Sequence, residues 1–200
     1  MNIDYLRENI IDSEDQRPEG VASPLQPYYH GLGCIRLCMK DGTFINFYSK
    51  KYIPEETKYI HTHRENFYSK SIHGEYDNVI YDVFVDDNSP YRLDYIECWP
   101  GGKTQRIFDN VNFTELTRMR LTEGSEMLHL YNDYHDLELV TDHCITRVTF
   151  DLSPPYPIEQ RGSIYPKIVW PIGDKDPNAA NNYGDEEDNW QIIREILNEV

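Results

Sequence analysis

Two histidines in the segment KYIHTHRENFYSKSIHGEY stand two positions apart, at His61 and His63. In an extended strand, side chains two positions apart point to the same side, so both imidazoles could bind one ion. Neutral imidazole is the commonest protein ligand of divalent transition metals. Histidine pairs also occur as ordinary polar residues of partly buried loops. The pair alone leaves both interpretations open.

Two glycines and a third histidine stand at fixed distances around this pair. Gly74 follows His63 by 11 residues, and in GSEMLHLYNDYHDLEL His135 follows Gly124 by 11 residues. These spacings resemble the first and second motifs of the cupin superfamily, over roughly residues 31–152. The chain departs from the two motifs at Glu55, Phe67, Leu130, Asn132 and Leu139. Of these, Phe67 stands where the first motif has a glutamate.

The resemblance implies that His61, His63 and His135 converge in the mouth of a barrel as a three-histidine metal site. Because the three ligands are neutral, a divalent ion keeps most of its charge. Its remaining coordination positions are open for water, oxygen or substrate. The site resembles the iron site of cupin thiol dioxygenases, which makes Fe(II) the leading expectation, while Zn(II), Ni(II), Cu(II) and Mn(II) stay open. The implied partner is a small-molecule substrate. Pairing between cupin barrels also leaves a homodimer open.

Two further residues are candidates for catalytic roles beside the metal. Counting by twos from His63 along an uninterrupted strand places His73 on the ligand side, as a fourth ligand or an acid–base group. A bend after Arg64 would break this alternation, and a polar residue at a strand end is the simpler interpretation of His73. Tyr134 could donate its phenolic proton to substrate or oxygen, although most of the 16 tyrosines must serve packing. For His129, which has no motif partner, a structural role is favoured.

The segments that must position these residues are short and extended. In CIRLCMKDGTFINFYSK, alternating residues flank the pair Asp41-Gly42, which predicts a β-hairpin. Further extended segments, separated by turn residues, are expected at 67–73, 77–85, 91–99, around 119–130, 137–141 and 144–152. Many short strands without a long helical period favour an all-β barrel or sandwich. The resemblance narrows this to a cupin-like double-stranded β-helix, or jelly-roll, barrel.

The two ends of the chain differ from this patterned middle. Residues 1–30 mix charges and prolines and are expected to form an N-terminal arm outside the core, with one short helical piece. The barrel is expected over residues 31–152. Residues 153–200 are expected to be an irregular C-terminal extension that wraps over the barrel. It ends in a helix at 189–199, predicted from the apolar spacing in NWQIIREILNEV, which packs on the barrel or on a partner.

Charge and cysteine content restrict the partners and the location. Lys and Arg number 19 against 35 Asp and Glu, and the net charge of −16 repels nucleic-acid phosphates and anionic membranes. We therefore expect neither a nucleic-acid partner nor a membrane partner. The 4 scattered cysteines form no CxxC pair, and the N-terminus lacks the pattern of a secretion signal. Both observations favour a cytoplasmic location.

Two functional hypotheses follow from these residues. The first is a metal-dependent cupin enzyme, a small-molecule oxygenase of the three-histidine, thiol dioxygenase-like kind. The second is a non-catalytic cupin that binds a small ligand or a partner protein, in which the departures from the motifs mark a decayed active site. A fold alone does not decide between catalysis and binding.

Overall fold

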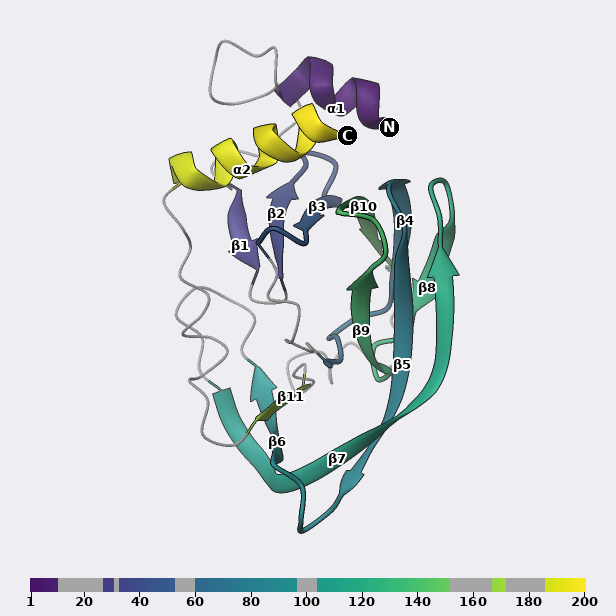
Figure 1. Cartoon of the computed structure of the whole chain (residues 1–200), viewed down its shortest axis with the longest axis vertical. Coiled ribbons are helices and arrows are strands. Elements are labelled where there is room, and N and C mark those ends of the chain that lie inside the picture. The colour runs from purple at the N-terminus through teal and green to yellow at the C-terminus, as the bar shows by residue number, and fades with distance from the viewer. Residues whose placement is uncertain (11–26, 31–32, 53–59, 97–103, 152–166, 172–185) are drawn as a thin grey trace.

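The structure is a computed structural model that describes residues 1–10, 27–30, 33–52, 60–96, 104–151, 167–171 and 186–200. Its strands form two antiparallel sheets (Figure 1), with the orders β1-β2-β3-β10-β4-β8 and β11-β6-β7-β5-β9. The described elements are α1 (Ile3–Ile10), β1 (Tyr28–His30), β2 (Cys34–Cys38), β3 (Phe44–Ser49), β4 (Phe67–His73), β5 (Tyr76–Val85), β6 (Tyr91–Ile96), β7 (Thr104–Leu121), β8 (Glu126–His129), β9 (Tyr134–Leu139), β10 (His143–Phe150), β11 (Lys167–Pro171) and α2 (Glu186–Glu199).

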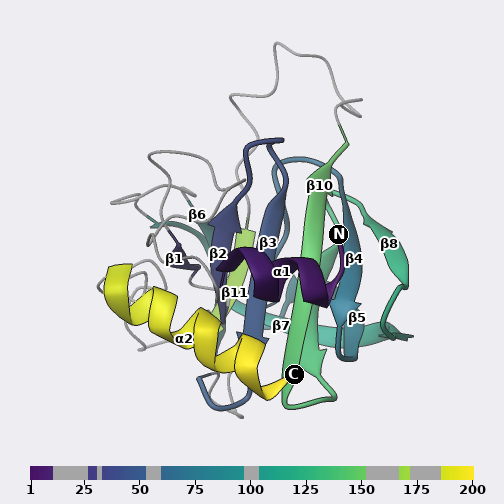
Figure 2. The same ribbon diagram turned by 90° about the horizontal axis from the view of Figure 1, so that it is seen from above.

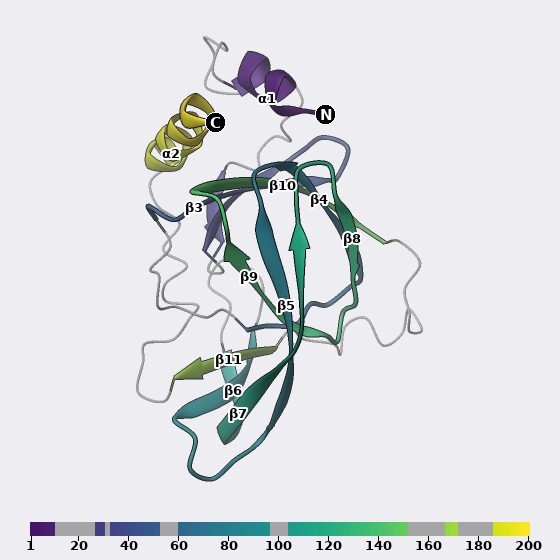
Figure 3. The same cartoon turned by 45° about the vertical axis from the view of Figure 1, so that its right-hand side comes forward.

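The strands pair as in a long hairpin that has been rolled into a barrel. β3 pairs with β10, β4 with β8, and β5 with β7. Between β3 and β4, His61 pairs with His135 of β9. The first four segments of the barrel thus pair with the last four in reverse order, which is the arrangement of a jelly roll. Figure 3 shows these strands curving around one interior. The predicted all-β barrel is confirmed.

The hairpin predicted around Asp41-Gly42 is also confirmed. β2 and β3 pair in one register, and Gly42 has a φ of 79°, which residues other than glycine rarely adopt. The Oδ1 atom of Asp41 accepts a hydrogen bond from the backbone N–H of Thr43 at 3.0 Å. Turn chemistry therefore fixes how the two strands align and which of their side chains face the interior.

The single strand expected around residues 119–130 is divided in two. β7 ends at Leu121, a turn that contains Gly124 follows, and β8 begins at Glu126. β7 also starts far earlier than expected, at Thr104, and pairs with both β6 and β5. Much of β7 is polar or charged, so its extent is set by these neighbouring strands rather than by its own pattern.

The C-terminal extension contains a strand that the sequence analysis does not predict. β11 pairs with β6 at the edge of the second sheet. The segments of the expected irregular wrap on either side of β11, residues 152–166 and 172–185, lie outside the described residues. The wrap therefore stays a prediction over those segments.

Both terminal helices contribute to the hydrophobic core beside the first sheet, and Figure 2 shows them over its strands. α2 confirms the predicted C-terminal helix and begins three residues earlier, at Glu186. Its Trp190 and Ile193 pack in one cluster with Leu6 of α1 and with residues of β2 and β3. Leu6 is 1% exposed, so the expectation that the N-terminal segment lies outside the core is wrong for α1. Neither described helix is long and apolar enough to cross a bilayer.

Candidate metal centre

The segment with the first two histidines lies between two strands. The backbone N–H of His61 donates to the carbonyl of His135 in β9, and the N–H of His135 donates to the carbonyl of His61, each at 2.9 Å. On the other side, the backbone N–H of Thr62 donates to the carbonyl of Lys167 in β11, also at 2.9 Å. The reciprocal pair places the side chains of His61 and His135 next to each other across the ladder.

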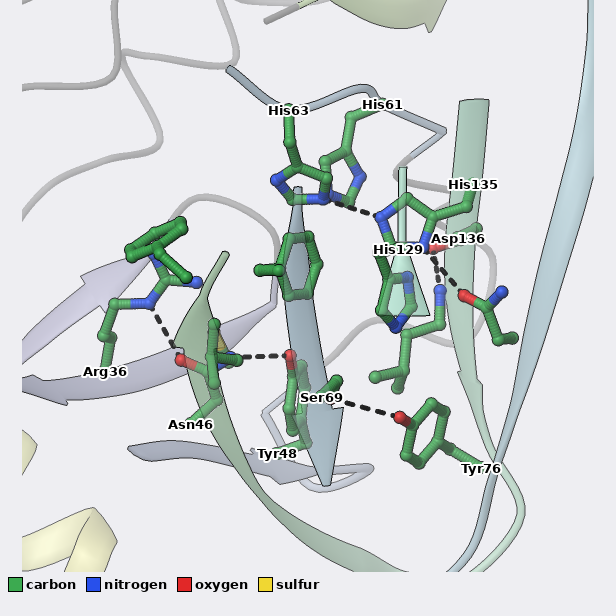
Figure 4. Close-up of a pocket in the computed structure, with 16 residues that line it drawn as sticks. Arg36, Asn46, Tyr48, His61, His63, Ser69, Tyr76, His129, His135 and Asp136 are labelled. Atoms are coloured by element: carbon green, nitrogen blue, oxygen red, sulfur yellow. Dashed lines mark hydrogen bonds between the residues drawn. The ribbon is translucent and has the colours of Figure 1, made fainter. Parts of the chain in front are cut away.

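Three imidazoles converge at this point. The possible ligand atoms of His61, His63 and His135 all lie within 4.8 Å of one another. The Nε2 atoms of His63 and His135 are 2.7 Å apart (Figure 4). His61 and His135 are 7% and 6% exposed, and His63 is half-buried. The structure thus brings together the three histidines that the resemblance to cupins selects.

Burial and a neighbouring amide prepare these rings to bind a cation. Burial, together with the neighbouring imidazoles, holds the pKa of His63 and His135 well below the ordinary value, so both rings are neutral at pH 7. The Nδ1 atom of His135 lies 2.8 Å from the Oδ1 atom of Asn78. Because an amide oxygen only accepts, Nδ1 carries the proton and Nε2 offers its lone pair. This donor set fits a divalent transition-metal ion.

The contact with Asn78 yields a test of this arrangement. Replacing Asn78 by Ala is expected to weaken metal binding roughly 10- to 100-fold, because the His135 ring loses the acceptor that fixes its orientation and tautomer. Isothermal titration with Zn(II) measures the affinity. The matched control is Asn132→Ala, since Asn132 is exposed and lies close to His135 in sequence. Equal zinc affinities in the two variants would rule out an orienting role for Asn78.

A small cavity opens beside the three histidines. It offers about 60 Å³ of room for water-sized molecules, and one water needs roughly 10–15 Å³ by the same measure. A few waters or a molecule of a few heavy atoms would therefore fill it. The lining residues are Cys34, Arg36, Asn46, Tyr48, His61, His63, Phe67, Ser69, Tyr76, Asn78, His129, His135, Asp136, Leu137, Val148 and Phe150.

Part of the cavity wall is polar. The amide Nδ2 of Asn46 donates to the hydroxyl of Tyr48 at 3.2 Å, and the hydroxyls of Ser69 and Tyr76 are 3.2 Å apart (Figure 4). Burial raises the pKa of Tyr76 to about 12, so its phenol stays protonated at neutral pH. The cavity thus joins a cluster of nitrogens that could bind a metal ion to hydroxyl groups that can hydrogen-bond a small molecule.

Comparison with known proteins finds similarity in fold only. No protein-family model and no curated protein sequence matches the chain. The Drosophila melanogaster CENP-C cupin domain is 7% identical, and the similarity covers 74% of this chain and 97% of that chain with a TM-score of 0.40. Hydroquinone 1,2-dioxygenase PnpCD, in complex with Cd²⁺ and 4-hydroxybenzonitrile, is 13% identical, with 77% and 78% covered and a TM-score of 0.33. Oxalate decarboxylase from Bacillus subtilis is 12% identical, with 86% and 38% covered and a TM-score of 0.29.

The fold class follows from the chain itself. Its strands pair in jelly-roll order. The histidines of the two segments that resemble cupin motifs lie together in one cluster of three. The barrel is cupin-like. In this cupin-like barrel, Phe67 stands where a carboxylate ligand is usual, and its ring lies 4.4 Å from that of His63. A phenyl ring offers no ligand atom, so the cluster keeps three neutral donors.

The two residues with expected catalytic roles lie elsewhere in the cupin-like barrel. The backbone bends at Arg64 and Glu65, so the uninterrupted strand counted from His63 does not form. The pairing of β4 with β10 also shifts register between Ser71 and His73, which breaks the alternation again. His73 is also six residues beyond Phe67, roughly 20 Å along the strand, and its Nδ1 atom lies 3.5 Å from a carboxylate oxygen of Glu123. Tyr134 packs beside the apolar cluster of the second sheet, and burial raises its pKa to about 12. Neither is among the described residues that line the cavity.

Other cavity residues were not identified from the sequence. Asn78 stands in the apolar-rich stretch DNVIYDVFV, where a polar residue at a buried position is only a weak signal. Tyr48 and Tyr76 could not be distinguished from the remaining tyrosines. His129 lacks a motif partner, and a structural role was therefore expected for it, yet its ring lines the cavity.

Proposed function

We propose that this protein is a metal-dependent oxygenase of small molecules, with His61, His63 and His135 as the ligands of a divalent transition metal. The convergence of three imidazoles beside a small cavity carries the proposal. Three neutral donors leave a divalent ion its charge and open positions, which suits chemistry on oxygen and a chelating substrate. The resemblance to thiol dioxygenases favours Fe(II) as the ion.

A small thiol is the proposed substrate. The room in the cavity corresponds to a molecule of a few heavy atoms. Addition of both atoms of one O₂ to a thiol R–SH gives the sulfinic acid R–SO₂H, so the reaction balances without a separate reductant. Iron bound by the three histidines would supply the activation of oxygen beside the substrate thiol.

The chain's own residues would prepare and confine this reaction. Burial keeps His63 and His135 neutral, and Asn78 fixes the orientation of His135. The apolar rings and side chains of Phe67, Val148 and Phe150 line the cavity and would exclude water from it. The hydroxyls of Ser69 and Tyr76 would hydrogen-bond the polar end of the substrate.

Metal content and oxygen uptake test the proposal. Protein purified without a metal-affinity step is expected to contain close to one iron or other transition metal per chain, and the triple variant His61→Ala, His63→Ala, His135→Ala is expected to contain none. Iron-loaded protein should consume oxygen in the presence of small thiols such as cysteamine or 3-mercaptopropionate, as followed with an oxygen electrode. Single substitution of His135 by Ala should abolish that uptake.

Two results would contradict the proposal in different ways. Stoichiometric metal in the triple variant would show that the histidines are not the ligands. Bound metal without oxygen uptake across a panel of small thiols would contradict the oxygenase, and it would support a cupin-like protein that only binds a ligand or a partner.

A further inference from the structure

A fourth histidine lines the same cavity without belonging to the metal cluster. His129 ends β8, where it pairs with Phe67 of β4. Its ring stacks on the Phe67 ring, with centroids 4.5 Å apart and planes inclined by 3°. The His129 ring also lies 4.8 Å from the His135 ring, and Figure 4 shows the two side by side. The stacking holds the imidazole in a fixed orientation at the cavity wall.

The Nε2 atom of His129 is buried without a hydrogen bond. The residue is 5% exposed, and Nε2 has no partner among the residues that the structure describes. Leaving a buried polar atom unpaired is unfavourable, and a molecule bound in the cavity that His129 lines would supply the missing partner. Burial also lowers the pKa of His129 to about 4, which leaves a neutral ring with one N–H donor and one acceptor.

Geometry separates His129 from the three ligand histidines. The group of possible ligand atoms that lie within 4.8 Å of one another contains His61, His63 and His135 but not His129. His129 therefore contacts the ring of His135, but its nitrogens are not part of the group of nitrogens that could bind one metal ion. His129 lines the same cavity as these three histidines.

We propose that His129 is a ligand-binding residue, whose imidazole N–H donates a hydrogen bond to a small anion, or to the anionic end of a substrate, held at an open position of the metal. This inference rests on the proposed metal site. An anion suits the position because it is attracted by the ion and accepts from a neutral donor. His129 would thus affect the binding of the anion, whereas the affinity for the metal would depend on the other three histidines.

Azide binding to the Co(II)-loaded protein tests this role without any catalytic turnover. Co(II) reports its ligands through its visible absorption, and azide is a linear anion of three atoms. The variant His129→Phe keeps an aromatic ring stacked on Phe67 and removes the donor. Because a hydrogen bond to a charged group contributes strongly, the azide affinity of His129→Phe should fall roughly 10- to 100-fold, while its Co(II) affinity stays within about twofold of the unsubstituted protein.

A second variant separates the hydrogen bond from the shape of the ring. His129→Gln carries an amide N–H near the position of Nε2, and its azide affinity should recover to within roughly fivefold of the unsubstituted protein. If His129→Gln binds azide as weakly as His129→Phe, the hydrogen bond is not the cause of the loss, and the proposal is wrong. The circular dichroism spectra of both variants should match that of the unsubstituted protein.

The remaining outcomes distinguish this inference from the proposed metal site. Normal Co(II) uptake with an azide affinity unchanged in His129→Phe would overturn the role of His129 alone. A Co(II) affinity that falls as far as the azide affinity would also overturn it, because His129 would then support the ligands. Absence of Co(II) uptake in the unsubstituted protein would overturn both proposals together.

Discussion

Saturating the metal-free protein with Zn(II) is expected to raise its melting temperature by roughly 8–16 °C. A ligand that binds only the folded state at about 1,000 times its dissociation constant stabilises that state by about 4 kcal/mol. For a chain of this size, each kcal/mol raises the melting temperature by about 2–4 °C. The ligand nitrogens meet only in the folded barrel, because His61 and His135 are brought together by strand pairing. Differential scanning calorimetry with and without Zn(II) measures the shift.

Two variants assign this shift to the three histidines. The triple variant His61→Ala, His63→Ala, His135→Ala should show less than about 2 °C of shift at the same Zn(II) concentration. The matched control is His73→Ala, which removes a histidine outside the cavity that contacts Glu123. It should keep the full shift. A full shift in the triple variant, or its loss in His73→Ala, would place the metal elsewhere.

The substitution Gly74→Ala is expected to destabilise the protein by roughly 3–5 kcal/mol. Gly74 has a φ of +77°, where an L side chain is strained. A Cβ atom there would lie 2.2 Å from the backbone carbonyl oxygen of His143 and 2.7 Å from Oγ1 of Thr141. A backbone oxygen cannot move aside without displacing the start of β10, so the strain in φ and the clash add. Urea unfolding of the purified variant measures the loss.

The other motif glycine is the matched control for this prediction. Gly124 has a similar φ of +83°, but a Cβ atom there would meet nothing within 4 Å. Gly124→Ala should therefore cost only the strain in φ, roughly 1–2 kcal/mol. The difference between the two variants isolates the contact with the backbone of His143. If both variants lose the same free energy of unfolding, the close approach at Gly74 is not what makes glycine necessary there.

Local sequence patterns were sufficient for several features of this protein. The Asp41-Gly42 turn predicted its hairpin, and the apolar spacing near the C-terminus predicted α2. The two motif spacings also selected the three histidines that converge. The turn and the helical period depend on neighbouring residues only, whereas the three histidines were selected by the resemblance of two motif spacings to those of cupins. The local sequence therefore determines the turn and the helix directly.

The interior of the barrel was decided by tertiary structure. β11 pairs with β6, which is distant in sequence, and β7 extends along both β5 and β6, so their own residues did not indicate their extent. The register shift in β4 and the length of that strand remove His73 from the site, although it shares a run of residues with the ligands. Asn78 enters the cavity because β5 pairs with β9, which carries His135, and His129 enters it because β8 pairs with β4 opposite Phe67. Strand pairing across the sheets determines which residues lie beside the ligand histidines, and no spacing along the chain predicts these neighbours.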